Sequence, residues 1–327
     1  MKSAAIIAFE GMFDSSLSVT LDILRCANQV SDGLGEESPP VEFGVYSASG
    51  EKVKTGGGLE INPVGMIEDL ECVDYVILPG IGISDSDQVA QILKQQDAIN
   101  LIDFIQRQRN NGAIISASCS ASFFLAEAGV FDDNAATTSW WLADEFQRRY
   151  PLVQLQVDKM IVSGDDYLCA GAAMAQADLM MLIVSKLYGA KVARLVANYL
   201  LIDRREYQSQ YIMSGLVSHK YPEVEKAEQW VRKNLSREFK ISDLANSIGI
   251  SERTLARRIQ AALGLSPLKF VQQLRIESAI HLLETTNRSF DVIAYDVGYS
   301  DAASLRRLLQ RHTGKLPGHF RSVRSNS

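Results

Sequence analysis

Residues 241–259 read ISDLANSIGISERTLARRI, and this stretch decides how the C-terminal part of the chain folds. Leu244 and Ile248 lie one helical turn apart, which predicts a short amphipathic helix. Gly249 then supplies the positive φ that a tight turn requires, and Ser251 is a good N-cap for a second helix. Two short helices joined by a glycine turn, the second with a basic free face, predict a helix-turn-helix.

The pattern occurs twice. Residues 293–317 read IAYDVGYSDAASLRRLLQRHTGKLP, against LANSIGISERTLARRIQAALGLSP in residues 244–267, at offsets of 49 or 50 residues. The recurring positions are Ala245, Leu255, Gly264 and Pro267, which return as Ala294, Leu305, Gly314 and Pro317. The second copy has one extra residue between its turn glycine and its buried leucine. A repeat at this period indicates a duplicated supersecondary unit.

Between the copies, residues 267–284 read PLKFVQQLRIESAIHLLE and predict one long amphipathic helix. We expect its inward face to consist of Phe270, Leu274, Ala279, Leu282 and Leu283. Such a helix would hold the two copies at a fixed separation.

The charge of the chain is divided unevenly. The net charge of −6 alone argues against a nucleic-acid partner. Residues 1–215, however, hold 15 basic and 28 acidic side chains, whereas residues 216–327 hold 18 basic and 11 acidic ones. An acidic half followed by a basic half is expected of a sensor joined to a DNA-binding module.

The basic half closely resembles the DNA-binding domain of the AraC family of transcription regulators. The matching segments are RTLARR, GLSPLKFVQQLRIESA, HLLE, VGYSD and LRRLLQRHTGKLP, which span roughly residues 222–324. The resemblance is specific because it combines two motifs, their spacing and the helix between them. It implies a sequence-specific, DNA-binding transcription regulator, with duplex operator DNA as partner and RNA polymerase as a further candidate partner.

We expect the early exposed residues of each recognition helix to contact DNA. These candidates are Ser251, Arg253, Thr254, Ala256, Arg257 and Arg258 in the first copy, and Ser300, Ala302, Ala303, Arg306 and Arg307 in the second. Arg257 and Arg307 match the arginine position of AraC-type recognition helices, and we favour base contact for both over phosphate contact. For Arg258 and Arg306 we favour phosphate or solvent. Expected backbone clamps are Lys269, Arg288 and Arg311.

The N-terminal half predicts a doubly wound α/β domain, because strand patterns alternate with helix patterns. Expected strands cover residues 3–9, 41–48, 75–82 and 112–118, followed after Pro151 by short antiparallel strands; expected helices cover residues 15–30, 88–110, the segment SASFFLAEAG and 172–202. We expect domains at residues 1–203 and 222–327, with a linker at residues 204–221.

Cys119 is the chemically notable residue of this half. It lies between a buried strand and a helix among small neighbours, which predicts the sharp turn of a nucleophile elbow. The segments SCSASFFLAEAGVFDDNAATTSWW and LPGIG resemble the PfpI-type, class I glutamine-amidotransferase-like domain, as found in GlxA-like regulators of the AraC family. The resemblance spans roughly residues 1–200 and implies a flavodoxin-like fold.

Catalysis by Cys119 is not expected. Enzymatic relatives of this domain activate the cysteine with a histidine, but all four histidines of this chain follow residue 218. The family motif ATTHW reads ATTSW here, with Ser139 in the histidine position. Without an imidazole no Cys–His dyad forms, although Asp14 or Glu10 remain candidates for an assisting carboxylate. A cysteine-dependent hydrolase or glyoxalase-like enzyme is the alternative function; a structural cysteine and a ligand-lining cysteine are equally favoured.

Small molecules bind open α/β sheets beyond the carboxyl ends of the strands. The candidate ligand-binding residues at that edge are Asp14, Ser15, Ser16, Gly80, Ile81, Gly82, Cys119, Ser120 and Trp140. Trp140 and Trp141 together offer an aromatic wall suited to a quaternary ammonium, or else are core or dimer-contact residues. Regulators that resemble this chain often sense nitrogenous metabolites, which we therefore expect as the effector class.

Several other classes are disfavoured. The four cysteines are scattered without a CxxC pair, so we expect neither a metal site nor a disulfide framework. We expect no cofactor, no signal peptide, no membrane span, a cytoplasmic location and a homodimer. Two non-enzymatic alternatives stay open: a helical protein-interaction adaptor without DNA affinity, and an architectural DNA binder without an effector.

Overall fold

A computed structural model of the chain describes residues 2–34, 40–203, 205, 208 and 221–322. The chain divides into two compact units, Met1–Arg205 and Glu206–Ser327. Nearly all of the predicted linker at residues 204–221 lies outside the described residues.

The first unit is built on a seven-stranded sheet with the order β10-β11-β7-β6-β1-β2-β5. Its strands are β1 (Ser3–Ile7), β2 (Glu42–Ser47), β5 (Gly65–Met66), β6 (Tyr75–Leu78), β7 (Ile114–Ser118), β10 (Ile161–Ser163) and β11 (Tyr167–Ala170). Neighbouring strands pair in parallel except β10 with β11. The central order β2-β1-β6-β7-β11 is the flavodoxin-like doubly wound arrangement, which confirms the predicted fold class.

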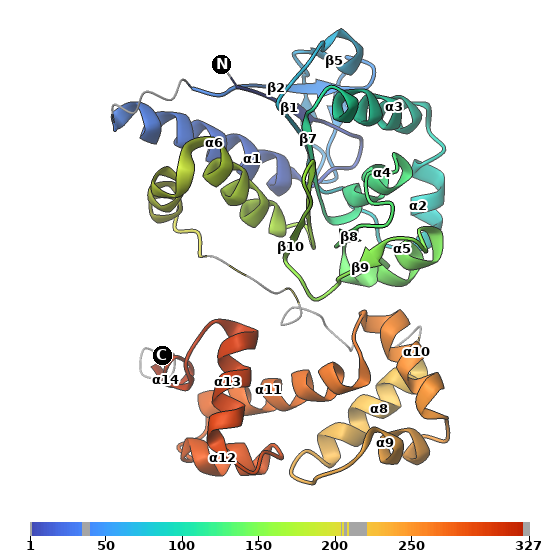
Figure 1. The fold of residues 1–327 in the computed structure, drawn as a ribbon, viewed down its shortest axis with the longest axis vertical. Coiled ribbons are helices and arrows are strands. Elements are labelled where there is room, and N and C mark those ends of the chain that lie inside the picture. The colour runs from blue at the N-terminus through green and yellow to red at the C-terminus, as the bar shows by residue number, and fades with distance from the viewer. Residues whose placement is uncertain (1, 35–39, 204, 206–207, 209–220, 323–327) are drawn as a thin grey trace. The chain divides into compact units, whose positions relative to one another are not determined.

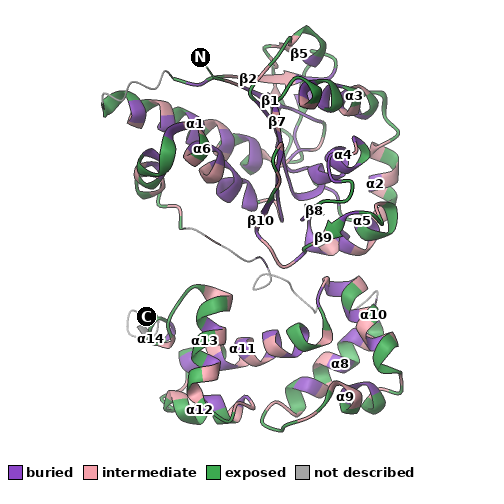
Figure 2. Ribbon diagram, in the orientation of Figure 1, coloured by how far each residue is buried: buried purple, intermediate pink, exposed green. Residues whose placement is uncertain are grey.

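Helices cover both faces of this sheet: α1 and α6 lie on one side, and α3 and α4 on the other (Figure 1). The helices are α1 (Asp14–Gly33), α2 (Ser86–Ile92), α3 (Gln96–Asn110), α4 (Ser122–Glu127), α5 (Ala143–Arg149) and α6 (Ala175–Tyr199), with 3-10 turns η1 (Ile67–Asp69), η2 (Cys119–Ala121) and η3 (Trp140–Leu142). Strands β6 and β7 are almost wholly buried, as parallel strands covered on both faces must be. Figure 2 shows the buried residues concentrated on the sheet and on the helix faces toward it.

The helix predicted over residues 88–110 is wrong, because the structure has two helices there. Helix α2 ends at Ile92, and the backbone leaves the helical region at Gln95, with ψ 147°, before α3 begins. The segment contains no glycine or proline, so no local signal marks the break. Each helix buries residues of its own, Val89 in α2 and Leu101, Phe104 and Ile105 among those of α3.

The antiparallel strands predicted after Pro151 are only partly present. β10 pairs antiparallel with β11, but β11 pairs parallel with β7 and thereby extends the main sheet. Short alternating patterns indicate strands without fixing their direction. Four further short strands form small two-stranded sheets, β3 (Val53–Lys54) with β4 (Glu60–Ile61) and β8 (Ala135–Ala136) with β9 (Gln154–Leu155), and the latter pair is parallel.

The second unit is helical. Its helices are α8 (Pro222–Lys233), α9 (Ile241–Ser247), α10 (Glu252–Leu263), α11 (Pro267–Thr285), α12 (Phe290–Asp296), α13 (Ala302–Thr313) and α14 (Pro317–Ser322). The pairs α9–α10 and α12–α13 are the two predicted helix-turn-helix copies, and their turn glycines Gly249 and Gly298 have φ values of 77° and 84°. Helix α11 joins them and buries Phe270, Leu274, Ala279 and Leu283, whereas Leu282 is half-buried.

Candidate functional site

Cys119 lies where β7 turns into the 3-10 helix η2, and its backbone has φ 57°. A non-glycine residue seldom adopts a positive φ, and such strain is typical of functional turns. The close approach of the neighbouring loop depends on a glycine, because a Cβ at Gly80 would lie 2.8 Å from the Cβ of Cys119. The structure therefore has the predicted elbow geometry.

The thiol of Cys119 is enclosed by polar groups of the chain. Its Sγ lies 2.9 Å from the hydroxyl oxygen of Ser139, the residue in the family's histidine position. Burial raises the pKa of the Cys119 thiol, and hydrogen bonds from Ser139, Ser120 and the Ala173 backbone only partly oppose this rise. The sulfur is consequently a protonated thiol at neutral pH and a poor nucleophile.

The two candidate carboxylates are bonded elsewhere. Asp14 accepts hydrogen bonds from the Thr55 hydroxyl at 2.6 Å and from the Gly57 amide at 2.9 Å. The bond from Thr55 is the largest cause that lowers the pKa of Asp14. Glu10 accepts from the Lys54 amide at 2.9 Å. These bonds hold the β3–β4 segment against the first loop.

Several loops at the carboxyl edge of the sheet converge on the elbow. The Phe13 amide donates to the Gly80 carbonyl at 2.8 Å, and the Ser120 hydroxyl donates to the Ile81 carbonyl at 2.5 Å. This edge thus brings together the candidate residues Asp14, Ser15, Ser16, Gly80, Ile81, Gly82, Cys119 and Ser120. Ser15 and Gly82 are exposed, Asp14 is half-buried, and the other five are buried.

Ser118 is a residue that sequence reasoning missed. Its hydroxyl is buried and has no hydrogen-bond partner among the described residues. The hydroxyl lies close to Gly80, since a Cβ added at that glycine would lie 3.3 Å from the Ser118 oxygen. A buried hydroxyl without a partner costs free energy, so a water or a bound molecule that supplied one would be stabilised there. Only the position of Ser118 beside Cys119 in the sequence signalled its importance.

The two tryptophans differ in their surroundings. Trp141 donates its indole N–H to the Ile83 carbonyl at 3.0 Å, in the loop that also receives Ser120. Trp140 has only 8% of its surface exposed and packs edge-on against Trp141, with ring centroids 5.4 Å apart. Trp141 is half-buried, so of the two rings it leaves the larger surface open to a ligand.

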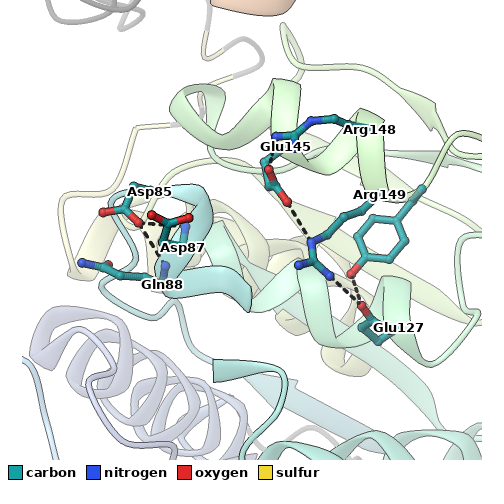
Figure 3. Close-up of polar contacts among 8 residues, drawn as sticks. Asp85, Asp87, Gln88, Glu127, Glu145, Arg148 and Arg149 are labelled. Carbon is teal, nitrogen blue, oxygen red and sulfur yellow. Dashed lines mark hydrogen bonds and ion pairs between the residues drawn. The ribbon is translucent and has the colours of Figure 1, made fainter. Parts of the chain in front are cut away.

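Ion pairs connect helix α5 with helix α4 (Figure 3). Glu145 of α5 binds both Arg148 and Arg149, and Arg149 also lies 3.5 Å from Glu127 at the end of α4. Tyr150 donates to the same Glu127 carboxylate at 2.8 Å. Helix α5 is thus tied to the helix that follows the elbow.

In the second unit, helix α10 has the cap and the free face expected of a recognition helix. The Ser251 hydroxyl caps it by accepting from the Thr254 amide. Arg253 and Arg257 are exposed, Thr254 and Ala256 are half-exposed. Arg258 is half-buried and lies 3.8 Å from the Glu223 carboxylate, so it serves the contact with α8.

Helix α13 presents a different set of side chains. Asp301, rather than Ser300, caps it by accepting from the Ser304 amide. Arg306 lies over the Phe290 ring, 5.4 Å from the centroid, and Arg307 donates to the Ser304 hydroxyl at 3.3 Å. Both arginines are exposed, as is Ala303, while Ala302 is half-exposed.

The predicted backbone clamps are not equivalent. Lys269 and Arg311 are exposed. Arg288 forms an ion pair with Asp296 at 2.7 Å, and its own carbonyl accepts from Arg321. Arg288 therefore holds the start of α12 in place as well as carrying a positive charge.

Among the described residues, no group of three or more histidine, cysteine or acidic side chains is arranged to hold a metal ion. Likewise, none of the described helices combines the length and apolar character that crossing a bilayer requires.

Comparison with known proteins gives two matches along the chain. Residues 2–186 match the DJ-1/PfpI family, and residues 244–322 match a helix-turn-helix domain. The HTH-type transcriptional regulator GbdR of Pseudomonas aeruginosa is 24% identical over 306 residues, which are 92% of this chain and 79% of that protein. The HTH-type transcriptional regulator GlxA of Rhizobium meliloti is 24% identical, covering 66% of this chain and 68% of that protein.

A solved structure is similar in fold. The AraC family transcriptional regulator from Pseudomonas putida aligns with a TM-score of 0.51 and 21% identity, covering 61% of this chain and 100% of that one.

Proposed function

The chain belongs to the DJ-1/PfpI family and is a DNA-binding transcription regulator with a C-terminal AraC-type domain, and on that premise we propose that its α/β unit binds a small effector without transforming it. We propose domains at residues 1–203 and 222–327. The remaining linker, residues 204–221, would pass the signal between them.

One observation carries the proposal that the unit senses rather than catalyses. The elbow is retained with its positive φ, yet the Cys119 thiol contacts Ser139 where an imidazole would be needed, and burial raises its pKa. A nucleophilic cysteine requires a lowered pKa or an adjacent base. A hydrolase or glyoxalase-like enzyme is the second candidate, and only the elbow geometry favours it.

The effector proposed is a small nitrogenous metabolite bound at the carboxyl edge of the sheet. Supporting this, Asp14 keeps a negative charge because hydrogen bonds lower the pKa of its carboxylate. The unpartnered Ser118 hydroxyl offers a second polar contact, and Trp140 an aromatic one. A carboxylate and an aromatic ring are both groups that attract a cationic nitrogen.

Arg205, at the end of the first unit, is bonded to a loop at that edge. Its guanidinium donates to the Met174 carbonyl at 2.7 Å and pairs with the buried Asp178. The adjacent Ala173 carbonyl accepts from Ser16 at 3.3 Å, and the Ala173 amide lies at Cys119. A molecule that moves this loop would thus move the start of the linker.

Thermal-shift measurements on the full chain test the effector. Amino acids and methylamine metabolites are screened, and a ligand at about a hundred times its Kd should stabilise the protein by about 2.7 kcal/mol, a shift of several degrees. Ser118→Ala should reduce that shift while leaving the free protein as stable as before, because the hydroxyl has no partner to lose.

Ser116→Ala is the matched control. Its hydroxyl lies on the same strand but donates to the Val76 carbonyl at 2.9 Å, so its loss should cost about 1 kcal/mol of stability without changing the ligand shift. A screen in which no nitrogenous compound stabilises the protein would contradict the effector class. Turnover that disappears on Cys119→Ala would instead support the enzyme.

The DNA-binding proposal assigns base contact to Arg257 and Arg307. Phosphate contact is proposed for Arg306 and for the clamps Lys269, Arg288 and Arg311. Further contacts to the duplex are proposed for Ser251, Arg253, Thr254, Ala256, Ser300, Ala302 and Ala303. Phosphate or solvent was expected for Arg258, but it pairs with Glu223, and we assign it to the packing of α10 on α8. A homodimer, contact with RNA polymerase and a cytoplasmic location complete the proposal. Sedimentation of the purified chain, free and bound to DNA, tests the dimer.

A further inference from the structure

Taken together with α8 and the loop that leads into α9, the first helix-turn-helix copy covers residues 222–263, and the second copy contacts that loop directly. The turn of the second copy approaches the loop between α8 and α9 of the first copy so closely that a Cβ at Gly298 would lie 2.2 Å from the Leu235 carbonyl oxygen. That distance is far below any real contact, and the neighbouring atom is backbone. Gly298 is therefore required by its φ of 84° and also by the contact between the copies.

The duplicated turn supplies an internal comparison. Gly249 occupies the same turn position in the first copy and has a similar φ of 77°, but an added Cβ there would meet nothing within 4 Å. Any side chain at either glycine strains the backbone to a similar extent. Only at Gly298 does a side chain also push the two copies apart.

Arg275 of helix α11 reaches both copies at this contact. In the first copy, its guanidinium donates a hydrogen bond to the Arg237 carbonyl at 3.2 Å and lies over the Phe239 ring, 5.4 Å from the centroid. In the second copy, it donates to the Gly298 carbonyl at 3.1 Å and lies over the Tyr299 ring, 5.5 Å from the centroid. One guanidinium thus binds one carbonyl and one aromatic ring of each copy.

Arginine suits this position for a chemical reason. Its planar guanidinium presents several N–H donors in a fixed fork and also binds aromatic faces. A lysine ammonium carries the same charge but lacks the rigid fork. A second tie, from Arg232 of α8 to Glu277 of α11 at 2.7 Å, holds the first copy to the same helix.

We propose that Arg275 and Gly298 are positioning residues that fix the separation of the recognition helices α10 and α13, and so set the half-site spacing that an operator must have. The inference rests on both recognition helices binding one duplex. Because a base pair adds about 3.4 Å of rise and about 35° of rotation, a rigid pair of helices cannot follow an inserted base pair. A loosened pair can follow it.

The test uses the full chain and a duplex obtained by selection from random-sequence DNA. Affinity is measured on that duplex and on versions with one base pair inserted or removed between the half-sites. The variants are Arg275→Gln, Arg275→Lys and Gly298→Ala, with Gly249→Ala as the matched glycine control. The quantity compared is the ratio of Kd on the altered duplex to Kd on the selected one.

We expect the wild-type chain and Gly249→Ala to bind the altered duplexes roughly tenfold to a hundredfold more weakly, the effect of losing base contacts in one half-site. In Arg275→Gln and Gly298→Ala this ratio should fall to within about threefold of one, and Arg275→Lys should lie between. The salt dependence of binding should be unchanged, because the same phosphates are contacted.

The outcomes separate the two claims. A wild-type chain indifferent to spacing would show that the helices do not bind one duplex together, which removes the premise. Spacing selectivity that persists in folded Arg275→Gln and Gly298→Ala would overturn the positioning role. Loss of the cooperative thermal transition in both variants would likewise assign the contact to stability and overturn the proposal.

Discussion

The elbow around Cys119 and the two recognition helices carry the polar side chains discussed above, and the two regions differ in how far these side chains are buried. At the elbow, the thiol and the hydroxyls of Ser120 and Ser139 are buried and contact other groups of the chain. On the helices, Arg257 and Arg307 are exposed. Groups bonded inside a fold shape it, whereas exposed charges on a rigid scaffold are available to a partner.

The comparison explains how one chain combines two unlike parts. The α/β unit has the strained turn of a nucleophile, but burial raises the pKa of its thiol and Ser139 lies where an imidazole would be needed. The helical unit commits its other ionic groups, such as Arg258 with Glu223 and Arg232 with Glu277, to holding its helices together. The exposed arginines Arg257 and Arg307 are the side chains proposed to contact DNA.

The largest effect is expected on the outward side of this comparison. Arg257→Ala and Arg307→Ala should each weaken binding to the selected duplex by about 1–3 kcal/mol, and each should relax base preference in a different half-site. The double variant should approach the sum, because the two side chains lie on separate helices. Binding measured on a panel of single-base substitutions checks this.

Arg311→Ala is the control for a phosphate contact. It should weaken binding on every sequence by a similar factor. The slope of log affinity against log salt concentration should become shallower by about one. If Arg257→Ala and Arg307→Ala also weaken binding equally on all sequences, both arginines contact phosphate and neither reads a base.

An intermediate effect is expected from a larger side chain in the buried elbow. Gly80→Ala places a methyl group 2.8 Å from the Cβ of Cys119, which should destabilise the protein by about 1–3 kcal/mol. Gly33→Ala, where an added Cβ meets nothing within 4 Å, should leave stability unchanged or slightly raised. Thermal unfolding of both variants provides the measurement; equal stability would show that the elbow is loosely packed.

The smallest effect concerns the buried thiols. Burial raises the pKa of Cys119, and raises the pKa of Cys169 from 9.0 to about 12. The folded chain therefore holds protons that the unfolded chain releases above pH 9, so stability should be complete below pH 9 and fall as the pH rises further. The expected slope is at most about 1.4 kcal/mol per pH unit for each thiol.

Unfolding between pH 8 and pH 10 checks that slope. Cys169→Ala should flatten the alkaline loss, whereas replacing the exposed Cys72 by alanine should not. A Cys169→Ala chain that loses stability as steeply as the wild type would show that this thiol already ionises in the folded state.

The sequence predicted the helical unit more completely than the α/β unit. Its signals are local: Ser251 caps α10, Gly249 and Gly298 take positive φ, and the repeat places the second copy. Contacts between distant residues were not predicted. Neither the pairing of Arg258 with Glu223 nor the reach of Arg275 to both copies leaves a mark on neighbouring positions.

In the α/β unit, the fold class and the elbow at Cys119 followed from the alternation of patterns and from the small residues around the turn. The break between α2 and α3 and the parallel pairing of β11 with β7 did not, because packing against the rest of the sheet decides them. The contact between Cys119 and Ser139 joins residues 20 positions apart. The ATTSW motif showed that a serine occupies the histidine position, but it did not show that this serine contacts the thiol.

A hydroxyl-radical footprint of the full chain on its selected duplex tests the central claim most directly. Two recognition helices held at one separation should protect two backbone segments on the same face of the DNA, about one helical turn apart. In Arg257→Ala and Arg307→Ala, protection should weaken at different segments. A single protected segment, or one that both substitutions erase together, would contradict the account.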